Sequence, residues 1–245
     1  MRKTLSSLFD KIEFPVLLAG IVVAGGLWGF LELMEVARDV APHTFDTQIL
    51  LAFREAGNPS NPIGSPRLEG AVRDITALGS AVVLILITAA TIIYFLLIKR
   101  WGTAFFVLAT VGGGQILSSL LKIGIDRPRP DLVSKLAVET SLSFPSGHAM
   151  LAAVTYLTLG TLAARFLPGR VTKIYVFVLA VLVTLMVGVS RLYLGVHWPS
   201  DVAAGWSFGT LWALGWWWAT LARLSTRRCH SLRRRGLVRA IKDSA

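Results

Sequence analysis

Three short polar runs in the sequence carry the residue types that phosphoryl transfer requires. They are KIGIDRPRP at 122–130, PSGH at 145–148 and SRLYLGVHWPSD at 190–201. Together they contain several cations, two histidines, a Ser-Gly turn and a carboxylate four residues after the second histidine. A phosphoryl group needs cations on its oxygens, a nucleophile, and an acid for the leaving group. The three runs therefore predict one site that handles a phosphate ester.

His197 and Asp201 are spaced to act as a pair. They lie four residues apart, and Pro199 between them is favoured in a first helical turn. Asp201 can then hold one imidazole nitrogen of His197, which fixes the tautomer and leaves the other nitrogen free to attack. A His-x-x-x-Asp pair taken alone is more often an ordinary hydrogen bond. A zinc site at His148 and His197 is a second alternative, although no third ligand follows at metal spacing.

Each remaining residue of the runs also has a structural explanation when taken alone. Lys122 and Arg191 end apolar stretches and suit cations that reach for the membrane surface. The alternation of arginine and proline at 127–130 suits a stiff loop. Ser146 and Gly147 suit a turn into a helix, whose free N–H groups would form an anion site beside the next residue, His148. Jointly, these explanations would require every group to converge by accident.

Six apolar stretches surround the runs, in a chain of 245 residues that is 54% apolar and only 16% charged. They cover about 15–34, 73–98, 102–121, 148–167, 172–190 and 201–222. About 20 apolar residues cross a hydrocarbon core of roughly 30 Å. The sequence therefore predicts an all-α polytopic membrane protein, with six transmembrane helices in a single domain over 1–245. A cleaved signal peptide is the alternative for the first stretch, and we expect a retained anchor.

The charge distribution predicts the orientation in the membrane. The net charge is +11, and 16 of the 25 basic residues fall on one side if the spans alternate. That side holds both termini, 1–14 and the basic tail 223–245, and lysine and arginine excess marks the cytoplasm. The polar runs then lie on the outer face. The tail, which contains Cys229, is expected to meet anionic lipid rather than nucleic acid.

The longest outer loop, 36–71, contains a predicted amphipathic helix. Phe45, Ile49 and Phe53 recur at helical spacing, while Asp46 falls on another face. This pattern predicts a short helix that lies in the outer interface on its aromatic face. Support for the bundle and guidance of lipid are both open as its role. Three prolines predict irregular chain in the rest of the loop: Pro59, Pro62 and Pro66.

Glycine and tryptophan positions add predictions on packing and membrane depth. Two Gly-x-x-x-Gly motifs, at 25–29 and 205–209, permit close approach of helices, and packing is expected for the glycines at 112–114. Trp198 suits the outer interfacial belt.

The three runs together resemble the signature of the type 2 phosphatidic acid phosphatase (PAP2) superfamily. That signature reads Lys-x6-Arg-Pro, Pro-Ser-Gly-His and Ser-Arg-x5-His-x3-Asp. Every signature position is filled here, and the spacing from Lys122 selects Arg129 rather than Arg127. The resemblance covers about 120–202 by motif and, through the six-span layout, nearly the whole chain.

The resemblance implies a mechanism without metal or cofactor. By resemblance, His197 attacks phosphorus to form a phosphohistidine and Asp201 orients it. His148 protonates the leaving oxygen and then activates water. Five residues would hold the phosphate oxygens: Lys122, Arg129, Ser146, Gly147 and Arg191.

The resemblance also implies a substrate class and a location. We expect a lipid phosphatase in a bacterial inner membrane, and undecaprenyl diphosphate is the first expectation for its substrate. Phosphatidylglycerophosphate, phosphatidate and lipid A are alternatives within this chemistry. A lipid phosphotransferase and a non-catalytic lipid transporter are alternatives beyond it, and the intact histidine pair argues against a transporter. Membrane lipids are the expected partners, and the oligomeric state stays open.

Overall fold

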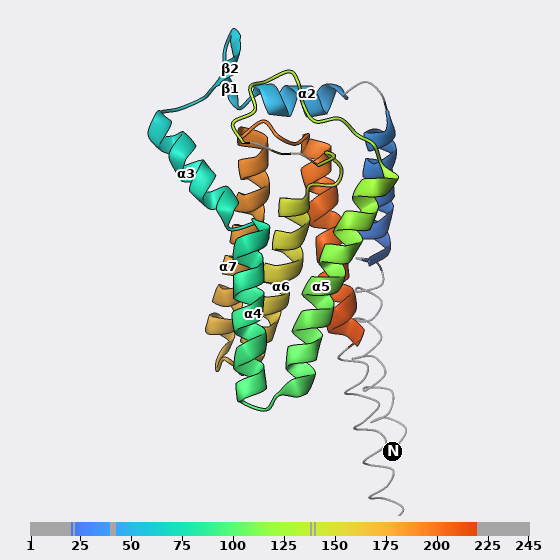
Figure 1. The fold of residues 1–245 in the computed structure, drawn as a ribbon, viewed down its shortest axis with the longest axis vertical. Coiled ribbons are helices and arrows are strands. Elements are labelled where there is room, and N and C mark those ends of the chain that lie inside the picture. The colour runs from blue at the N-terminus through green and yellow to red at the C-terminus, as the bar shows by residue number, and fades with distance from the viewer. Residues whose placement is uncertain (1–20, 22, 40–42, 138, 140, 220–245) are drawn as a thin grey trace, which may run out of the picture.

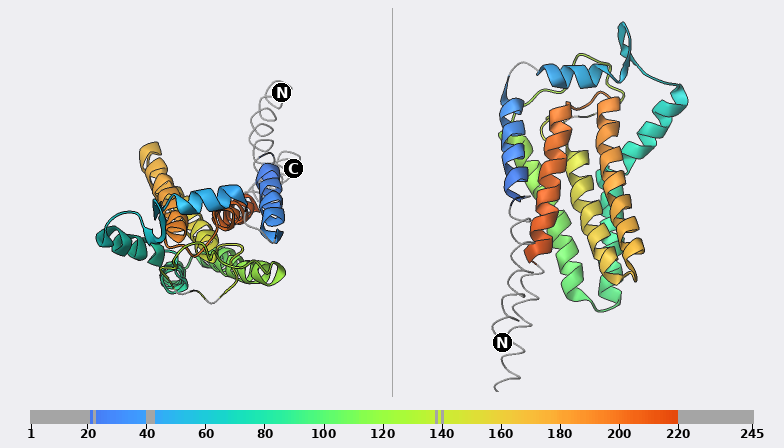
Figure 2. Two further views of the ribbon diagram at one scale, coloured as in Figure 1. Left: turned by 90° about the horizontal axis from the view of Figure 1, so that it is seen from above. Right: turned by 180° about the vertical axis from the view of Figure 1, so that it is seen from behind.

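The computed structural model describes residues 21, 23–39, 43–137, 139 and 141–219, which form a helical bundle (Figure 1). Its longest labelled helices are α4 (Ala81–Leu97), α5 (Trp101–Gly124), α6 (Gly147–Phe166) and α7 (Arg170–Tyr193). Two further helical segments, 23–38 and 199–219, lie alongside them (Figure 2). The bundle confirms the predicted helical class.

The described residues contain three helices that could span a membrane, or four if a bent helix pair counts as one span. Helices α5, α6 and α7 are each long and apolar enough to cross a membrane. Helix α3 (Pro66–Ala77) and α4 pass the same test together, with a bend of 44° between them. The first and sixth expected spans extend into residues outside the described part, as do the termini 1–14 and 223–245. The six-span layout and its orientation therefore stay predictions.

Apolar side chains cover the outside of the bundle, as expected for helices that face lipid. Leu97 is 76% exposed, and Ile123 and Val171 are 80% exposed. Helix α6 differs, because all its residues from 149 to 155 are buried. It lies at the centre and packs against both α5 and α7. The first turn of this interior helix lies at the end of the bundle where the polar runs meet.

Gly205 and Gly209 bring the segment 199–219 against α6. A Cβ added to Gly205 would lie 2.8 Å from a backbone oxygen at the start of α6, and one on Gly209 would lie 2.5 Å from the next turn. Real side chains do not approach a backbone so closely, so the predicted packing role of this motif is confirmed. No described atom lies within 4 Å of a Cβ placed at Gly25 or Gly29.

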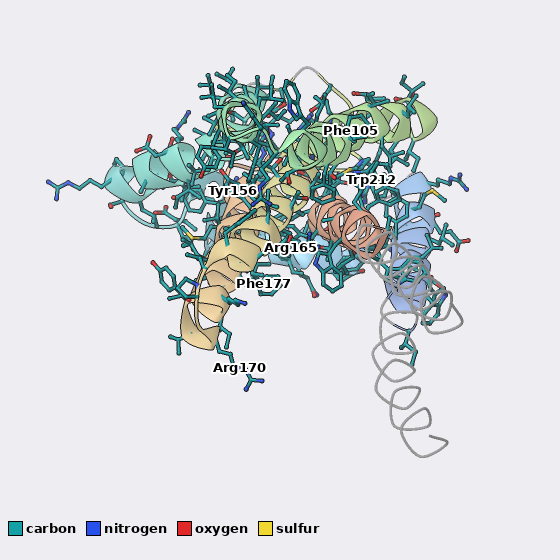
Figure 3. The ribbon with its side chains drawn as sticks, turned by 90° about the horizontal axis from the view of Figure 1, so that it is seen from below. Phe105, Tyr156, Arg165, Arg170, Phe177 and Trp212 are labelled. Carbon is teal, nitrogen blue, oxygen red and sulfur yellow. The ribbon has the colours of Figure 1, made fainter. Side chains whose placement is uncertain are left out.

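Trp212 connects the same segment to α5. Its Nε1 donates to the Thr110 carbonyl oxygen at 2.8 Å, and its side chain lies between the two helices (Figure 3). Its ring atoms would lie 2.8 Å from a Cβ on Gly113. Gly113 and Gly114 therefore serve packing, whereas a Cβ on Gly112 would meet no described atom within 4 Å, and the helix is continuous from Trp101 to Gly124.

Helix α2 (Thr44–Leu51) lies across the end of the bundle where α6 begins (Figures 1 and 2). The helix expected from the sequence is present, but the burial of Asp46 was not predicted. Asp46 and Leu50 are fully buried, whereas Phe45 is 41% and Ile49 is 43% exposed. The carboxylate turns inward because it has ionic partners in the bundle, which the local pattern cannot reveal.

The remainder of the 36–71 loop is more regular than its prolines suggested. Strands β1 (Arg54–Glu55) and β2 (Asn58–Pro62) form a small antiparallel hairpin, and α3 begins at Pro66. Arg54 connects the hairpin to the bundle by a hydrogen bond. Its Nη1 donates at 2.9 Å to the carbonyl oxygen of Tyr193, the last residue of α7.

Trp198 lies in the interior rather than at the membrane interface. It is 4% exposed and packs with Leu50 and Val133 beneath α2. Its Nε1 donates to the Pro128 carbonyl oxygen at 3.1 Å, so its polar edge is satisfied within the protein. The predicted interfacial position is wrong.

Candidate active site

The three polar runs meet at one end of the bundle, beneath α2. Lys122 lies in the last turn of α5, and the described residues 125–137 and 141–146 lie at the bundle end between α5 and α6. His148 lies in the first turn of α6, and Arg191 lies in the last turn of α7. The short connection at 194–198 then places His197 beside them. The structure thus brings together residues that the sequence spreads over 80 positions.

His197 is buried, with its two ring nitrogens in different surroundings. Its Nε2 lies 3.2 Å from Nη1 of Arg129, and its Nδ1 lies 3.4 Å from Oγ of Ser143. A guanidinium can only donate, so Nε2 is the acceptor and the proton resides on Nδ1. The lone pair of Nε2 therefore faces the cations of the polar runs.

The charge state of His197 also suits a nucleophile. Burial lowers the pKa of His197 to about 4, and Arg129 and Arg191 also lower it, against the raising effect of Asp201. The imidazole is therefore neutral near pH 7, and its Nε2 lone pair is available for attack.

Asp201 is the buried acceptor behind His197. Its Oδ2 accepts from Ser143 Oγ at 2.5 Å and from the Trp198 backbone nitrogen at 2.9 Å. Its distance to Nδ1 of His197 is 3.6 Å, which is longer than a hydrogen bond. Asp201 thus acts on the imidazole by its charge and through the Ser143 hydroxyl, which stands between them. Ser143 was not predicted, and its only signal is its place two residues before the second run.

Lys122 and Arg129 both hold the chain just before α6. Lys122 Nζ donates to Ser141 Oγ and to the Leu142 carbonyl oxygen, each at 3.0 Å. Arg129 Nε donates to the Ser141 carbonyl oxygen at 2.8 Å, and its Nη1 donates to the Val196 carbonyl oxygen at 2.7 Å. The two cations therefore lie on one segment, and Arg129 also contacts His197.

Glu139 places a carboxylate among these cations, and no sequence pattern predicted it. It is hydrogen-bonded to Arg191, and it lies 3.6 Å from Nη2 of Arg129 and 4.0 Å from Nδ1 of His148. Burial would raise the pKa of Glu139, but Arg191, His148 and Arg129 outweigh burial and hold it below its usual value. The cluster thus holds an anionic group already. No motif marks Glu139, which precedes the second run by six residues.

Two buried polar atoms of the runs have no hydrogen-bond partner among the described residues. They are Nε of Arg191 and Oγ of Ser146. Ser146 is the N-cap of α6, and a Cβ on the following Gly147 would lie 3.6 Å from Cε of Lys122. Buried polar groups are nearly always paired, and free N–H groups at a helix start favour an anion. An anion at the start of α6 would meet both requirements.

Arg127 lies apart from this cluster. Its side chain is buried and forms ion pairs with Asp46 at 2.8 Å and with Asp201 at 2.6 Å. Arg129, in contrast, touches His197 directly. The geometry therefore agrees with the spacing argument that separates the two arginines.

Comparisons with known proteins identify the family of this chain. Residues 102–225 match the PAP2 superfamily. Phosphatidylglycerophosphatase B of Bacillus subtilis is 38% identical over 153 residues, which cover 61% of this chain and 73% of that protein. Undecaprenyl-diphosphatase of Sulfolobus acidocaldarius is 35% identical over 71 residues, which cover 29% of this chain and 30% of that protein.

A solved structure has the same fold. It is the crystal structure of a transmembrane PAP2-type phosphatidylglycerolphosphate phosphatase from Bacillus subtilis, with a TM-score of 0.69 and 32% sequence identity. The match covers 80% of this chain and 94% of that chain. The family match contains all three polar runs, and the structural match extends over most of the bundle that positions them. The chain therefore belongs to the PAP2 superfamily and is a lipid phosphatase.

Proposed function

We propose that this protein removes the terminal phosphate of a membrane lipid phosphate or diphosphate through a phosphohistidine on His197. One observation carries the proposal: the unprotonated Nε2 of His197 points toward a cation cluster that already holds a carboxylate. A phosphoryl group bound by Arg129 and Arg191 would present its phosphorus to this nitrogen.

In the first step, the Nε2 lone pair forms a bond to phosphorus as the bond between phosphorus and the lipid oxygen breaks. His148, at the start of α6, gives its proton to the departing oxygen. The cations and the N–H groups at the start of α6 stabilise the charge on the phosphoryl oxygens, the contribution that is usually largest in such reactions. Ser143 and Asp201 stabilise the positive charge on the phosphorylated ring.

In the second step, His148 is neutral and takes a proton from water. The water oxygen forms a bond to phosphorus, the bond from phosphorus to Nε2 breaks, and inorganic phosphate leaves. His197 returns to its neutral form, and His148 ends protonated for the next cycle.

Two substrates are proposed in order. Phosphatidylglycerophosphate comes first, because the similarity to phosphatidylglycerophosphatase B extends over more of the chain than the similarity to undecaprenyl-diphosphatase. Undecaprenyl diphosphate, the first expectation from the sequence, comes second. Phosphate release from both lipids, with phosphatidate as a third, ranks them directly. A strong preference for phosphatidate would remove both assignments and leave the chemistry intact.

The site is proposed to face the outside of a bacterial inner membrane. The excess of lysine and arginine in the opposite loops and both termini supports this orientation. In intact spheroplasts, a membrane-impermeant thiol reagent should label a cysteine placed at Ser134 but not Cys229. Labelling of Cys229 alone would reverse the orientation.

The proposed chemistry is tested with the purified protein in detergent. His197→Ala should reduce phosphate release by several orders of magnitude, about the effect of losing a catalytic nucleophile or base. His43→Ala is the matched control, since His43 is an exposed histidine paired with Asp39 at the rim of the bundle. Equal activity of the two variants would contradict the assignment of the nucleophile.

A further inference from the structure

A buried row of charges runs from α2 to Asp201. Oδ2 of Asp46, in α2, accepts from Nη2 of Arg127 at 2.8 Å. Nη1 of Arg127 donates to Oδ1 of Asp201 at 2.6 Å. Asp46 and Asp201 are fully buried and Arg127 is 4% exposed, so water does not screen these contacts. Two carboxylates thus share one guanidinium directly behind His197.

Ser200 closes the row into a ring of hydrogen bonds. Its backbone nitrogen donates to Oδ1 of Asp46 at 2.8 Å, and its hydroxyl donates to Oδ2 at 2.6 Å. The same hydroxyl accepts from Nη1 of Arg127 at 2.6 Å. The Trp198 ring lies 5.7 Å from the guanidinium carbon of Arg127. Every polar atom of the Asp46 carboxylate is therefore used by the residues that neighbour His197 and Asp201 in the chain.

Attachment of α2 to the bundle does not by itself explain these charges. Well-packed apolar residues stabilise a buried contact as well as an ion pair does, because the ions must first lose their water. Leu50 of α2 already makes such a contact with Val133 and Trp198. What the ionic row adds is a fixed position and a defined charge at Asp201.

We propose that Asp46 and Arg127 are positioning residues for the His197–Asp201 pair. Asp46 holds Arg127, and Arg127 fixes Oδ1 of Asp201 and offsets part of its charge. The other oxygen, Oδ2, is thereby directed at Ser143 and the imidazole. The proposal rests on the proposed role of His197, and it gives α2 a role as a support of the catalytic pair.

The row predicts opposite effects of its two members on the pKa of His197. Without the Arg127 cation, Asp201 acts on the imidazole with its full charge, and the pKa of His197 rises. Without the Asp46 charge, the Arg127 cation is less neutralised, and the pKa of His197 falls. Five other charged or titratable groups act on His197, and none of them is substituted in these variants: Arg129, Glu139, His148, Arg191 and Asp201. Of these, only Asp201 is expected to change position.

The test compares Asp46→Asn and Arg127→Gln in the full chain, purified in detergent. Each should lower kcat about 10–100-fold, the usual effect of losing a residue that orients a functional group from behind, with KM changed little. The pKa of His197, followed by ¹⁵N NMR of its imidazole, should rise in Arg127→Gln and fall in Asp46→Asn. The acid limb of the kcat/KM profile should move in the same directions.

Matched controls come from an exposed ion pair on α3. Arg73 and Glu69 lie 2.6 Å apart near the same end of the bundle, so Arg73→Gln and Glu69→Gln should behave as the wild type. The double variant Asp46→Asn with Arg127→Gln restores the charge balance, and its His197 pKa should return toward the wild-type value. Asp46→Asn keeps the side-chain shape and carries the test if Arg127→Gln does not fold.

Three results would overturn the proposal. They are a wild-type kcat in Asp46→Asn, a loss of kcat without a shift in the pKa of His197, and shifts of the same sign in both variants. The NMR titration needs no turnover, so it remains valid if His197 proves not to be the nucleophile. Failure of the proposed function and failure of this inference are therefore distinguishable.

Discussion

Alanine at Arg127 is expected to destabilise the fold much more than alanine at Arg129, two positions along the same loop. Arg127→Ala leaves Asp46 and Asp201 fully buried without their shared cation. Breaking a buried ion pair costs about 3–5 kcal/mol. Since two carboxylates lose one partner here, we expect the upper part of that range, about 4–5 kcal/mol.

Arg129→Ala has a different expected effect. The Arg129 side chain donates mainly to backbone carbonyl oxygens. Its removal leaves no buried carboxylate without a cationic partner, because Glu139 is still bonded to Arg191 and Asp201 is still bonded to Arg127. Its loss removes one preorganised donor beside Nε2 of His197. Such a loss lowers kcat by about 10²–10³.

Thermal unfolding in detergent, followed by tryptophan fluorescence, measures the contrast. In a protein of this size 1 kcal/mol changes Tm by about 2–4 °C, so Arg127→Ala should melt about 8–20 °C below the wild type. The Tm of Arg129→Ala should be much closer to that of the wild type, whereas its kcat per folded molecule should fall further than that of Arg127→Ala. If Arg129→Ala melts at the lower temperature, the separate roles of the two arginines are refuted.

Four further predictions concern the site. Glu139→Gln should lower the inhibition constant of vanadate, because the Glu139 carboxylate competes with the vanadate anion for Arg191. A higher inhibition constant would show that Glu139 assists anion binding instead. Asp201→Asn should lower kcat by up to about 10⁴ while the imidazole remains, and an unchanged kcat would exclude its orienting role. The pKa of His197, about 4, predicts that the nucleophile loses its lone pair only as pH falls through that value, so an acid limb assigned to His197 by ¹⁵N NMR near pH 7 would contradict it. Phosphate release should persist in excess EDTA, and loss that zinc or magnesium restores would overturn the metal-free mechanism.

Much of the site could be predicted from the sequence because its residues lie in short runs of fixed spacing. Within 145–148, four consecutive residues specify both a helix start and the groups beside it. Apolar length alone located the three helices long enough to span a membrane and the bent pair α3–α4, since crossing a bilayer requires about 20 residues whatever the neighbours are. The convergence of Lys122, Arg191 and His197 followed from alternate spans that end on one face.

The residues that the sequence missed depend on contacts between distant segments. Asp46 bonds Ser200, which lies 154 positions away, and no local pattern reveals such a partner. The helical periodicity of α2 was correct, but the burial of Asp46 was not predicted, because a local pattern does not reveal a distant cationic partner. Trp198 was assigned to the membrane interface because its amphipathic ring suits that position. In the structure its ring lies against Arg127 instead, a contact that the local pattern does not show.

Glu139 illustrates a second limit. A carboxylate in a loop has no preferred spacing to the groups that it meets, so only the folded chain shows that it binds Arg191 beside His148. Its position among the cations also indicates where a substrate anion would bind, and a sequence motif does not give that position in space.

The central claim is that His197 carries the phosphoryl group, and covalent trapping tests it most directly. The purified protein is mixed for milliseconds with a ³²P-labelled lipid phosphate, quenched in alkali and digested for peptide mapping. We expect an alkali-stable, acid-labile label on the peptide that contains His197, present in the wild type and in His43→Ala and absent in His197→Ala. A label on His148 or on a serine, or undiminished turnover by His197→Ala, would contradict it.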